Sequence, residues 1–211
     1  GVDVVLGLAS RPRHAAARLA QVLLDRGYAS VRPVLSSDDR AEVIDVAEQL
    51  EDEKRFTRLA KGFEEGYLGR GGKAKVFMLD LRGPDAPPMA SESEALAKLD
   101  DNIAVISSML GGYAAEHFGF LLHSRSPLMM RKNLLGPEDE AKHPQKTPTN
   151  RELGTFLSVM ERRRVCVLQF LGPSSGTVRL IPVQPAEEEE LSEDEEEEEV
   201  ERRKEVRLAA K

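Results

Sequence analysis

Strand-like and helix-like patterns of apolar residues alternate over the first 82 residues of the chain. Short continuous apolar runs are typical of strands buried on both faces. The runs are separated by segments whose apolar residues recur three or four positions apart, as in an amphipathic helix. This β-α-β-α-β order predicts an α/β fold with a Rossmann-like start and a parallel sheet with right-handed crossovers. The strand-like runs are residues 2–9, 29–35 and 75–81, and the helical segments are residues 14–26 and 37–63.

Residues that favour helix ends support these helices and predict two more. Glycine suits the position after a helix because it tolerates a positive φ. A serine or threonine followed three residues later by glutamate forms a capping box, in which each side chain binds the backbone of the other residue. The predicted helix ends are Gly27 after the first helix, Ser36 or Ser37 before the second, Ser91 with Glu94 before a long third helix, and Thr149 with Glu152 before a shorter fourth.

The long third helix carries apolar residues whose spacing alternates between three and four over three heptads. Such a seam occurs on one face of a core helix and also in helices that pair with a partner helix, so both interpretations stay open. Gly111 and Gly112 cost a helix about 1 kcal/mol each. We expect them either to end the helix or to let another backbone approach closely. The seam consists of Leu96, Leu99, Ile103, Ile106, Leu110, Tyr113 and His117.

Prolines mark a change in organisation after residue 123. Residues 124–150 contain four prolines among charged residues, which predicts an extended arm. The stretch RVCVLQFLGPSSGTVRLIPV, after the fourth helix, predicts two strands joined by a five-residue turn. The predicted organisation is an α/β body over residues 1–123, the arm over 124–150, a helix and β-hairpin that complete the body over 151–185, and an acidic, helical tail over 186–211.

Residues 121–135, LLHSRSPLMMRKNLL, combine apolar pairs with Arg125, Arg131 and Lys132 and have no regular period. If the leucines and methionines are exposed, they form an adhesive patch for a protein partner. If they are buried, they belong to the core. Both interpretations stay open.

The net charge of −7 is distributed unevenly along the chain. Residues 187–211 contain 13 acidic and five basic side chains, whereas the remainder contains 24 acidic and 25 basic side chains. A nearly neutral body lacks the basic face that binding through nucleic-acid phosphates requires, so we expect no direct nucleic-acid site. We expect the acidic tail to meet a basic surface, such as that of a ribonucleoprotein, in a contact that weakens with salt.

Composition favours an intracellular protein. The single cysteine, Cys166, excludes an internal disulfide and favours a reducing compartment. It lies in a strand-like run without a neighbouring histidine, so a buried structural thiol is preferred over a nucleophile. No apolar run approaches the length of a membrane span. The chain begins at Gly1 rather than Met, which is compatible with a removed leader and with a location in the cytoplasm or an organelle matrix.

The loop after the first apolar run is chemically suited to an anion. In a parallel α/β sheet, the first β-α turn aims backbone N–H groups and a helix N-terminus at a bound phosphate. Gly7 permits close approach, Ser10 offers a hydroxyl donor, and Arg11 and Arg13 offer positive charge. The glycines of the dinucleotide pattern G-x-G-x-x-G are absent. An ordinary first crossover is therefore the alternative to a cofactor site at residues 7–13.

The stretch VVLGLASRP, with VLLDRGYASVRPV further on, resembles the start of the small coenzyme-A-binding Rossmann domains. Those domains open with an apolar strand, a loop of small residues with proline, a helix that ends in LL and GY, and a second strand. The resemblance covers residues 2–35 and is shifted by one residue in the loop. It implies that a nucleotide or coenzyme A binds at Gly7, Ser10, Arg11 and Arg13.

Other motifs with known chemistry are incomplete. GYLGRGGKAK, residues 66–75, lacks the spacing of a phosphate-binding loop, since Tyr67 stands where the first glycine should precede Lys73. The four histidines lack metal-ligand spacing, and the G-x-S-x-G of a serine hydrolase is absent. Asp80, at the end of a strand-like run, is either the centre of an α/β transferase or the cap of a loop.

These observations lead to hypotheses from different functional classes. The first is a non-catalytic interaction subunit of a larger intracellular assembly, which docks through the heptad-spaced helix, the extended arm and the acidic tail. Its partners are protein subunits or a ribonucleoprotein. The alternative is a Rossmann-like domain that binds a nucleotide or coenzyme A at residues 7–13, and the third hypothesis is the transferase centred on Asp80.

Overall fold

The structure is a computed structural model of the 211-residue chain, and it describes residues 1–7, 12–84, 86–172 and 178–180. Contacts divide the chain into two units, residues 1–172 and 173–211. The helices and strands of the description below all belong to the first unit. The predicted acidic tail, residues 186–211, lies outside the described residues.

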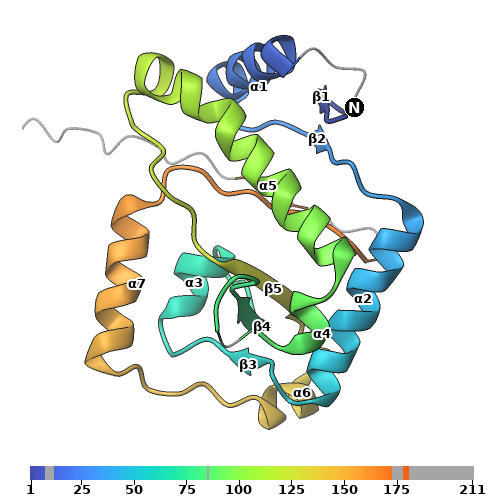
Figure 1. Cartoon of the computed structure of the whole chain (residues 1–211). Coiled ribbons are helices and arrows are strands. Elements are labelled where there is room, and N and C mark those ends of the chain that lie inside the picture. The colour runs from blue at the N-terminus through green and yellow to red at the C-terminus, as the bar shows by residue number, and fades with distance from the viewer. Residues whose placement is uncertain (8–11, 85, 173–177, 181–211) are drawn as a thin grey trace, which may run out of the picture. The chain divides into compact units, whose positions relative to one another are not determined.

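A short parallel pair of strands opens the chain. Strand β1 (Val4–Val5) pairs with β2 (Val31–Arg32), and helix α1 (Pro12–Arg26) connects them (Figure 1). Gly27 follows the helix with a φ of 74°, and its N–H donates to the carbonyl oxygen of Leu23 over 2.8 Å. The predicted β-α-β start is therefore present, although its two strands pair over only two residues each.

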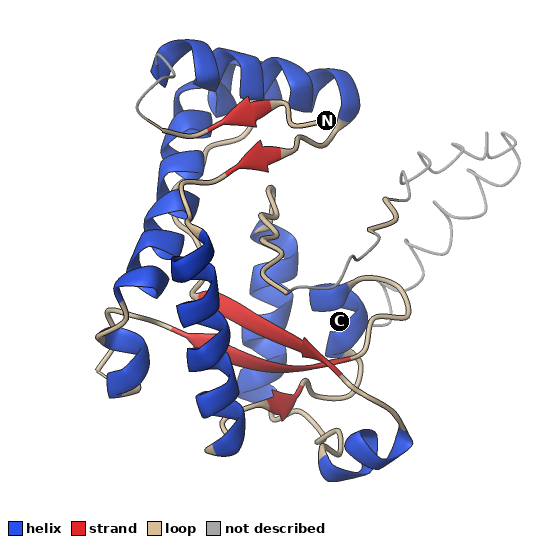
Figure 2. Ribbon diagram, turned by 90° about the vertical axis from the view of Figure 1, so that its right-hand side faces the viewer, coloured by secondary structure: helices blue, strands red, loops and turns tan. Residues whose placement is uncertain are grey.

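The third predicted strand belongs to a separate, antiparallel sheet. Strand β4 (Ala74–Leu79) lies between β3 (Thr57–Arg58) and β5 (Leu128–Asn133), and it pairs with β5 along its whole length. Figure 2 shows these two longer strands side by side, apart from the parallel pair. The prediction of a single Rossmann-like parallel sheet is therefore wrong. Over the part of the chain that the structure describes, the fold is a mixed α/β fold with two small sheets.

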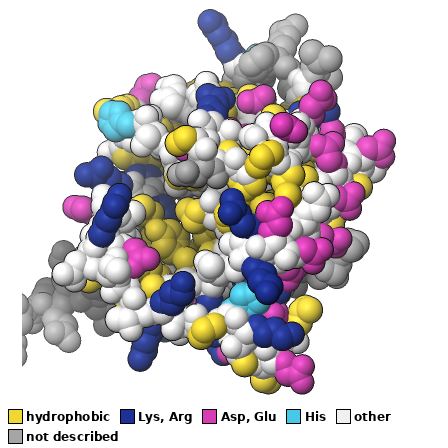
Figure 3. All heavy atoms as spheres, turned by 60° about the horizontal axis from the view of Figure 1, so that its bottom comes forward, with side chains coloured by type: hydrophobic (Ala, Val, Ile, Leu, Met, Phe, Trp, Pro, Cys, Tyr) yellow, Lys and Arg dark blue, Asp and Glu magenta, His cyan; other side chains and the backbone are white. Residues whose placement is uncertain are grey.

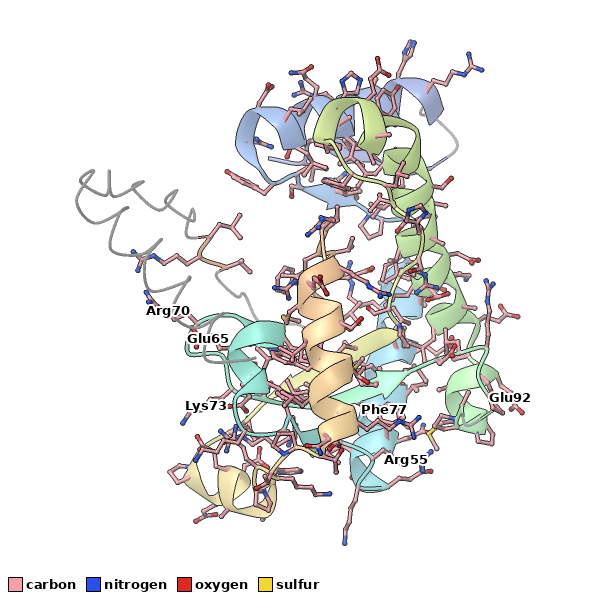
Figure 4. The ribbon with its side chains drawn as sticks, turned by 90° about the vertical axis from the view of Figure 1, so that its left-hand side faces the viewer. Arg55, Glu65, Arg70, Lys73, Phe77 and Glu92 are labelled. Carbon is pink, nitrogen blue, oxygen red and sulfur yellow. The ribbon has the colours of Figure 1, made fainter. Side chains whose placement is uncertain are left out.

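Helices lie on both sides of the antiparallel sheet. In Figures 1 and 4, α2, α4 and α5 lie on one side of the sheet, and α3 and α7 lie on the other. Helix α5 extends past the sheet to contact α1 and ends in a π-helical turn, η1 (Ala114–Phe118). The remaining helices are α2 (Ser37–Asp52), α3 (Phe63–Leu68), α4 (Pro88–Ser91), α5 (Glu94–Tyr113), α6 (Pro137–Lys142) and α7 (Asn150–Arg162).

Helix α5 contributes to two clusters of buried hydrophobic residues. Leu96, in its first half, packs with α2 and the antiparallel sheet, where Leu50 and Leu79 are 0% and 1% exposed. Ile106 and Leu110, in its second half, pack with β1 and α1. The seam from Leu96 to Leu110 therefore lies in the core, in agreement with the core-helix interpretation, whereas Tyr113 is half-buried and His117 is exposed in η1. A docking function has to rest on other surfaces.

The ends of α5 differ from the prediction. Its N-cap is Ser93, whose Oγ accepts a backbone hydrogen bond over 3.2 Å, whereas the predicted cap Ser91 ends α4. Gly111 and Gly112 neither end the helix nor meet another backbone. The helix continues to Tyr113. If either glycine carried a Cβ, no described atom outside the helix would lie within 4 Å of it.

Helix α2 is shorter than predicted. It begins after Ser36, as the capping pattern indicates. It ends at Asp52, and two residues later Lys54 adopts a left-handed φ of 58° that a right-handed helix cannot continue through. The residues between Lys54 and Phe63 then form β3 and a turn instead of two further helical turns.

Three predictions for the C-terminal half are also corrected. Residues 124–150 are not an extended arm, because they contain β5 and α6. Residues 164–172 form no strand, and residues 181–183 lie outside the description, so the predicted hairpin is not found in the described chain. Cys166 is exposed rather than buried.

Asp39 of α2 is paired with Lys98 of α5, whose Nζ lies 2.6 Å from Asp39 Oδ1. This bond, followed by the bonds that Asp39 accepts from Ser36, lowers the pKa of Asp39 from 3.8 to about 2. Because the folded pKa lies below the unfolded value, the resulting stability is complete above about pH 4 and is lost as the pH falls towards about 2. We expect Asp39→Asn to remove this part of the acid dependence of the free energy of unfolding, measured by urea denaturation across that interval.

Asp38 provides the matched control, because it is an exposed neighbour that forms no ion pair with a described residue. Asp38→Asn should leave the acid dependence of the unmodified chain intact. An equal loss in both variants would show that the pairing with Lys98 is not its source.

Candidate interaction surface

The predicted anion loop is described only at its two ends. Gly7 is exposed and has a φ of 139°, and Arg13 is exposed in the first turn of α1. Ser10 and Arg11 lie outside the described residues. The four residues therefore stay a predicted site.

Asp80 lies in a tight turn at the end of β4. Its Oδ1 accepts a hydrogen bond from the backbone N–H of Arg82 over 3.1 Å, and its carbonyl oxygen accepts one from Gly83 over the same distance. These bonds agree with the loop-capping interpretation of Asp80. In Figure 4, Phe77 lies beside Arg55, whose guanidinium carbon is 5.8 Å from the ring centroid. An open recess next to the turn is lined by Phe77, Met78, Pro84 and Pro87 together with Asp80.

Three cationic side chains lie in register across the antiparallel sheet. Arg58 of β3 is opposite Lys75 of β4, which is opposite Lys132 of β5, so the three share one face of the sheet. Lys75 is only 3% exposed, and Lys73 lies nearby. Four carboxylates from α2, α3 and α6 form ion pairs with these cations. They are Glu51, Glu64, Asp139 and Glu140.

Burial and ion pairing act in opposite directions on the central groups of this network. Burial lowers the pKa of Lys75, but the hydrogen bonds that it donates to Glu51 and Asp139 outweigh burial and raise the pKa above its ordinary value. Burial raises the pKa of Glu51, and bonds from Lys132 and Lys75 outweigh it and lower that pKa. Each charge is therefore held in its ionised form by a partner, which suits a structural role better than proton transfer.

Helix α7 packs on α3 through aromatic rings. The Phe156 ring stacks on Phe63 with centroids 4.2 Å apart, and Tyr67 meets Phe156 edge-on at 5.5 Å. Gly66 permits this approach, because a Cβ at that position would lie 2.6 Å from the Phe156 ring. A terminal nitrogen of Arg163 donates to the carbonyl oxygen of Gly66 over 2.7 Å and ties the end of α7 to α3.

The rest of the apolar face of α7 is open. The capping box of Thr149 and Glu152 begins the helix as predicted, yet no residue of α7 is buried. Leu153 is 41% exposed and Leu157 is 56% exposed. The two leucines are four positions apart and therefore lie on the same side of the helix. They form an exposed apolar pair.

Basic side chains follow this apolar pair. Arg162, Arg163 and Arg164 are exposed, and none pairs with a carboxylate among the described residues. Helix α2, on the other side of the sheet, is acidic, with seven acidic residues and one basic residue. On the face shown in Figure 3, Lys and Arg side chains surround a hydrophobic area on the left half, and Asp and Glu side chains gather on the right.

The chain after α7 has the side-chain alternation of a strand, although it pairs with no strand among the described residues. From residue 166 to residue 171, odd-numbered side chains are half-buried and even-numbered ones are exposed, Leu168 at 56% and Phe170 at 69%. Val167 packs against the core cluster near α1, and Leu171 packs against the cluster near α2. Residues 165–172 form no hydrogen bond with any residue that the structure describes. We call residues 165–171 the open strand; Figure 1 shows it passing behind α5.

Sequence reasoning identified both apolar segments and missed that they are open. It assigned the open strand to a hairpin, and it predicted α7 from its capping box without indicating which of its faces is exposed. One signal was available, namely the run Arg162–Arg164, because three consecutive cations between two apolar segments do not enter a core together.

Within the described ranges, no group of three or more His, Cys, Asp or Glu side chains is arranged to hold a metal ion. Among the helices of this part of the chain, none combines the length and the apolar character needed to cross a membrane. Comparison with family models, with curated proteins and with solved structures found no match to the chain.

Proposed function

We propose that the protein is a non-catalytic interaction subunit that binds a partner protein through the C-terminal part of its first unit. The binding surface, here called the C-terminal docking surface, consists of Leu153, Leu157, Arg162–Arg164, Leu168 and Phe170. One observation carries the proposal. The four apolar side chains of this surface are all at least 41% exposed.

An exposed apolar surface of this kind is unfavourable in isolation. Burial of apolar area stabilises a complex by about 25 cal/mol per Å². Clustered exposed apolar residues beside charged ones mark interaction sites more often than scattered ones do. A partner that covers the leucines and Phe170 and offers carboxylates to Arg162–Arg164 would combine hydrophobic burial with charge complementarity.

The acidic residues 187–211 support a second contact. Their 13 carboxylates favour a basic surface, such as that of a ribonucleoprotein, and predict association that weakens as salt is added. This part of the proposal rests on composition, since these residues lie outside the description.

Leu157→Asp tests the proposal, because it places a charge in the apolar contact. The side chain is 56% exposed in the free chain, so the variant should fold with a free energy of unfolding within about 0.5 kcal/mol of the unmodified chain. Tagged full-length chain is used to recover partner proteins from an extract of the source cells, and mass spectrometry quantifies them. We expect recovery of the main partner to fall about tenfold or more.

Leu121→Asp is the matched control, because Leu121 is 58% exposed and lies outside the C-terminal docking surface. It should recover partners as the unmodified chain does. Undiminished recovery by Leu157→Asp, or an equal loss by Leu121→Asp, would contradict the proposal.

The alternative function is binding of a nucleotide or coenzyme A at residues 7–13. The observation in its favour is the β1-α1-β2 unit, because a helix between parallel strands begins behind such a loop. A rise in melting temperature with added coenzyme A or nucleotide would favour this alternative, since a ligand stabilises the folded state by mass action.

A further inference from the structure

The open strand combines an extended conformation with backbone groups that have no partner among the described residues. Its odd-numbered side chains are held against the body, with Val167 in one core cluster and Leu171 in the other. In an extended chain, the N–H and C=O groups of successive residues point to opposite edges. Since residues 165–172 form no hydrogen bond with the described chain, neither edge is paired within it. Such an edge is a template for another strand.

We propose that the open strand binds the partner by strand addition, in which an extended segment of the partner protein forms a β-ladder with its backbone. This inference rests on the proposed function and names the contact made at the C-terminal docking surface. The partner segment carries apolar residues at alternate positions, which cover Leu168 and Phe170. Its end beside Arg162–Arg164 carries Asp or Glu.

The backbone argues for a strand rather than a helix as the occupant. A helix satisfies its own N–H and C=O groups and would bury those of the open strand without partners, which is unfavourable for each buried group. A strand supplies the missing hydrogen bonds and aligns alternate side chains with Leu168 and Phe170.

The charges argue for acidic residues at one end of the partner segment. Arg163 and Arg164 donate only to the carbonyl oxygens of Gly66 and Glu161 among described groups, and neither pairs with a carboxylate there. Three adjacent guanidinium groups repel a basic segment and attract an acidic one. The packing of Val167 and Leu171 also fixes the extended conformation in advance, which lowers the entropy that binding must remove.

A synthetic peptide provides the probe. In its sequence, two glutamates precede alternating valine and threonine residues. A second version carries N-methyl groups at every other residue, which removes the backbone N–H donors along one edge of the peptide strand. Both peptides are titrated against the full chain, and amide hydrogen exchange of residues 165–172 is followed by mass spectrometry. We expect the first peptide to slow exchange of alternate amides about tenfold or more. The N-methylated peptide should have no such effect.

Proline substitutions in the full chain separate the two edges. Cys166→Pro removes a donor from one edge, and Gln169→Pro removes a donor from the other. Both leave an extended backbone allowed. We expect one proline variant to bind the peptide about fivefold more weakly or worse, as the loss of a hydrogen bond implies. The controls Cys166→Ala and Gln169→Ala keep the donors and should bind within about twofold of the unmodified chain.

Equal binding by each proline variant and its alanine counterpart would overturn strand addition. Slow amide hydrogen exchange of residues 165–172 in the chain without peptide would also overturn strand addition, because the edge of the open strand would then already be paired. If that protection rises with the concentration of the chain, the occupant is a second copy rather than a partner. A failure in these measurements, with the Leu157→Asp loss intact, would leave the proposed function standing and remove only this mode of contact.

Discussion

Leu96→Ala is expected to lower the free energy of unfolding by about 3 kcal/mol, as large-to-small substitutions at fully packed sites do. Leu96 is 1% exposed and packs where α5 meets α2 and the antiparallel sheet. Removing its isobutyl group loses hydrophobic burial and leaves a cavity that rigid neighbours fill poorly. Urea denaturation followed by circular dichroism measures the change.

Val105→Ala is the matched control on the same helix, because Val105 is 47% exposed. It should leave stability within about 0.5 kcal/mol, since alanine also favours the helical conformation. A loss comparable to that of Leu96→Ala would contradict the assignment of the core face.

The same experiment tests whether α5 couples the two core clusters. Leu96 and Leu110 both lie on α5, but Leu96 packs in the cluster with α2 and Leu110 packs in the cluster with β1 and α1. We expect Leu110→Ala and Leu96→Ala to shift one common unfolding transition. Two separate transitions, each moved by only one of the variants, would show that the clusters unfold independently.

Glu51→Gln is expected to lower the free energy of unfolding by about 2–3 kcal/mol, less than the loss of a sole partner from a buried ion pair. Glu51 pairs with both Lys75 and Lys132. Lys75 is 3% exposed, so its charge then depends on Asp139 alone, 3.1 Å away. Thermal and urea denaturation at neutral pH and low salt measure the effect.

Glu48→Gln is the control for this variant, because Glu48 is an exposed carboxylate on the same helix and forms no ion pair with a described residue. It should change stability by no more than about 0.5 kcal/mol. If the two variants have the same stability, the ion pairs of Glu51 contribute nothing measurable to the fold.

The sequence predicted helices more reliably than strands, for a physical reason. Helix α7 and the start of α2 depend on local capping boxes, which Thr149 with Glu152 and Ser36 with Asp39 provide. Strand β3 is two residues long and exists through its pairing with β4, which no local pattern encodes. Tertiary pairing of this kind overrides local preference.

Strand β5 illustrates the same limit. Its sequence, LMMRKN, has no regular period because both faces of the strand are partly covered. Leu128 and Met130 pack against the core, which confirms the core interpretation for the middle of residues 121–135. Leu121 and Leu135, on either side, are 58% and 89% exposed.

The C-terminal docking surface could be predicted only in part. The apolar face of α7 follows from its spacing, but its exposure depends on the length of the helix that faces it. Helix α3 has six residues and α7 has 13, so at about 1.5 Å per residue α3 reaches along less than half of α7. No local sequence feature of α7 reports that mismatch.

The opposite charges of α2 and of the Arg162–Arg164 run give the described part of the protein an electric dipole. A negatively charged molecule diffusing nearby would feel a torque before any contact forms, and the encounter would begin with the arginines foremost. Orientation of this kind raises the association rate while leaving dissociation to short-range contacts. Added salt should therefore slow the arrival of an acidic partner far more than it hastens its departure.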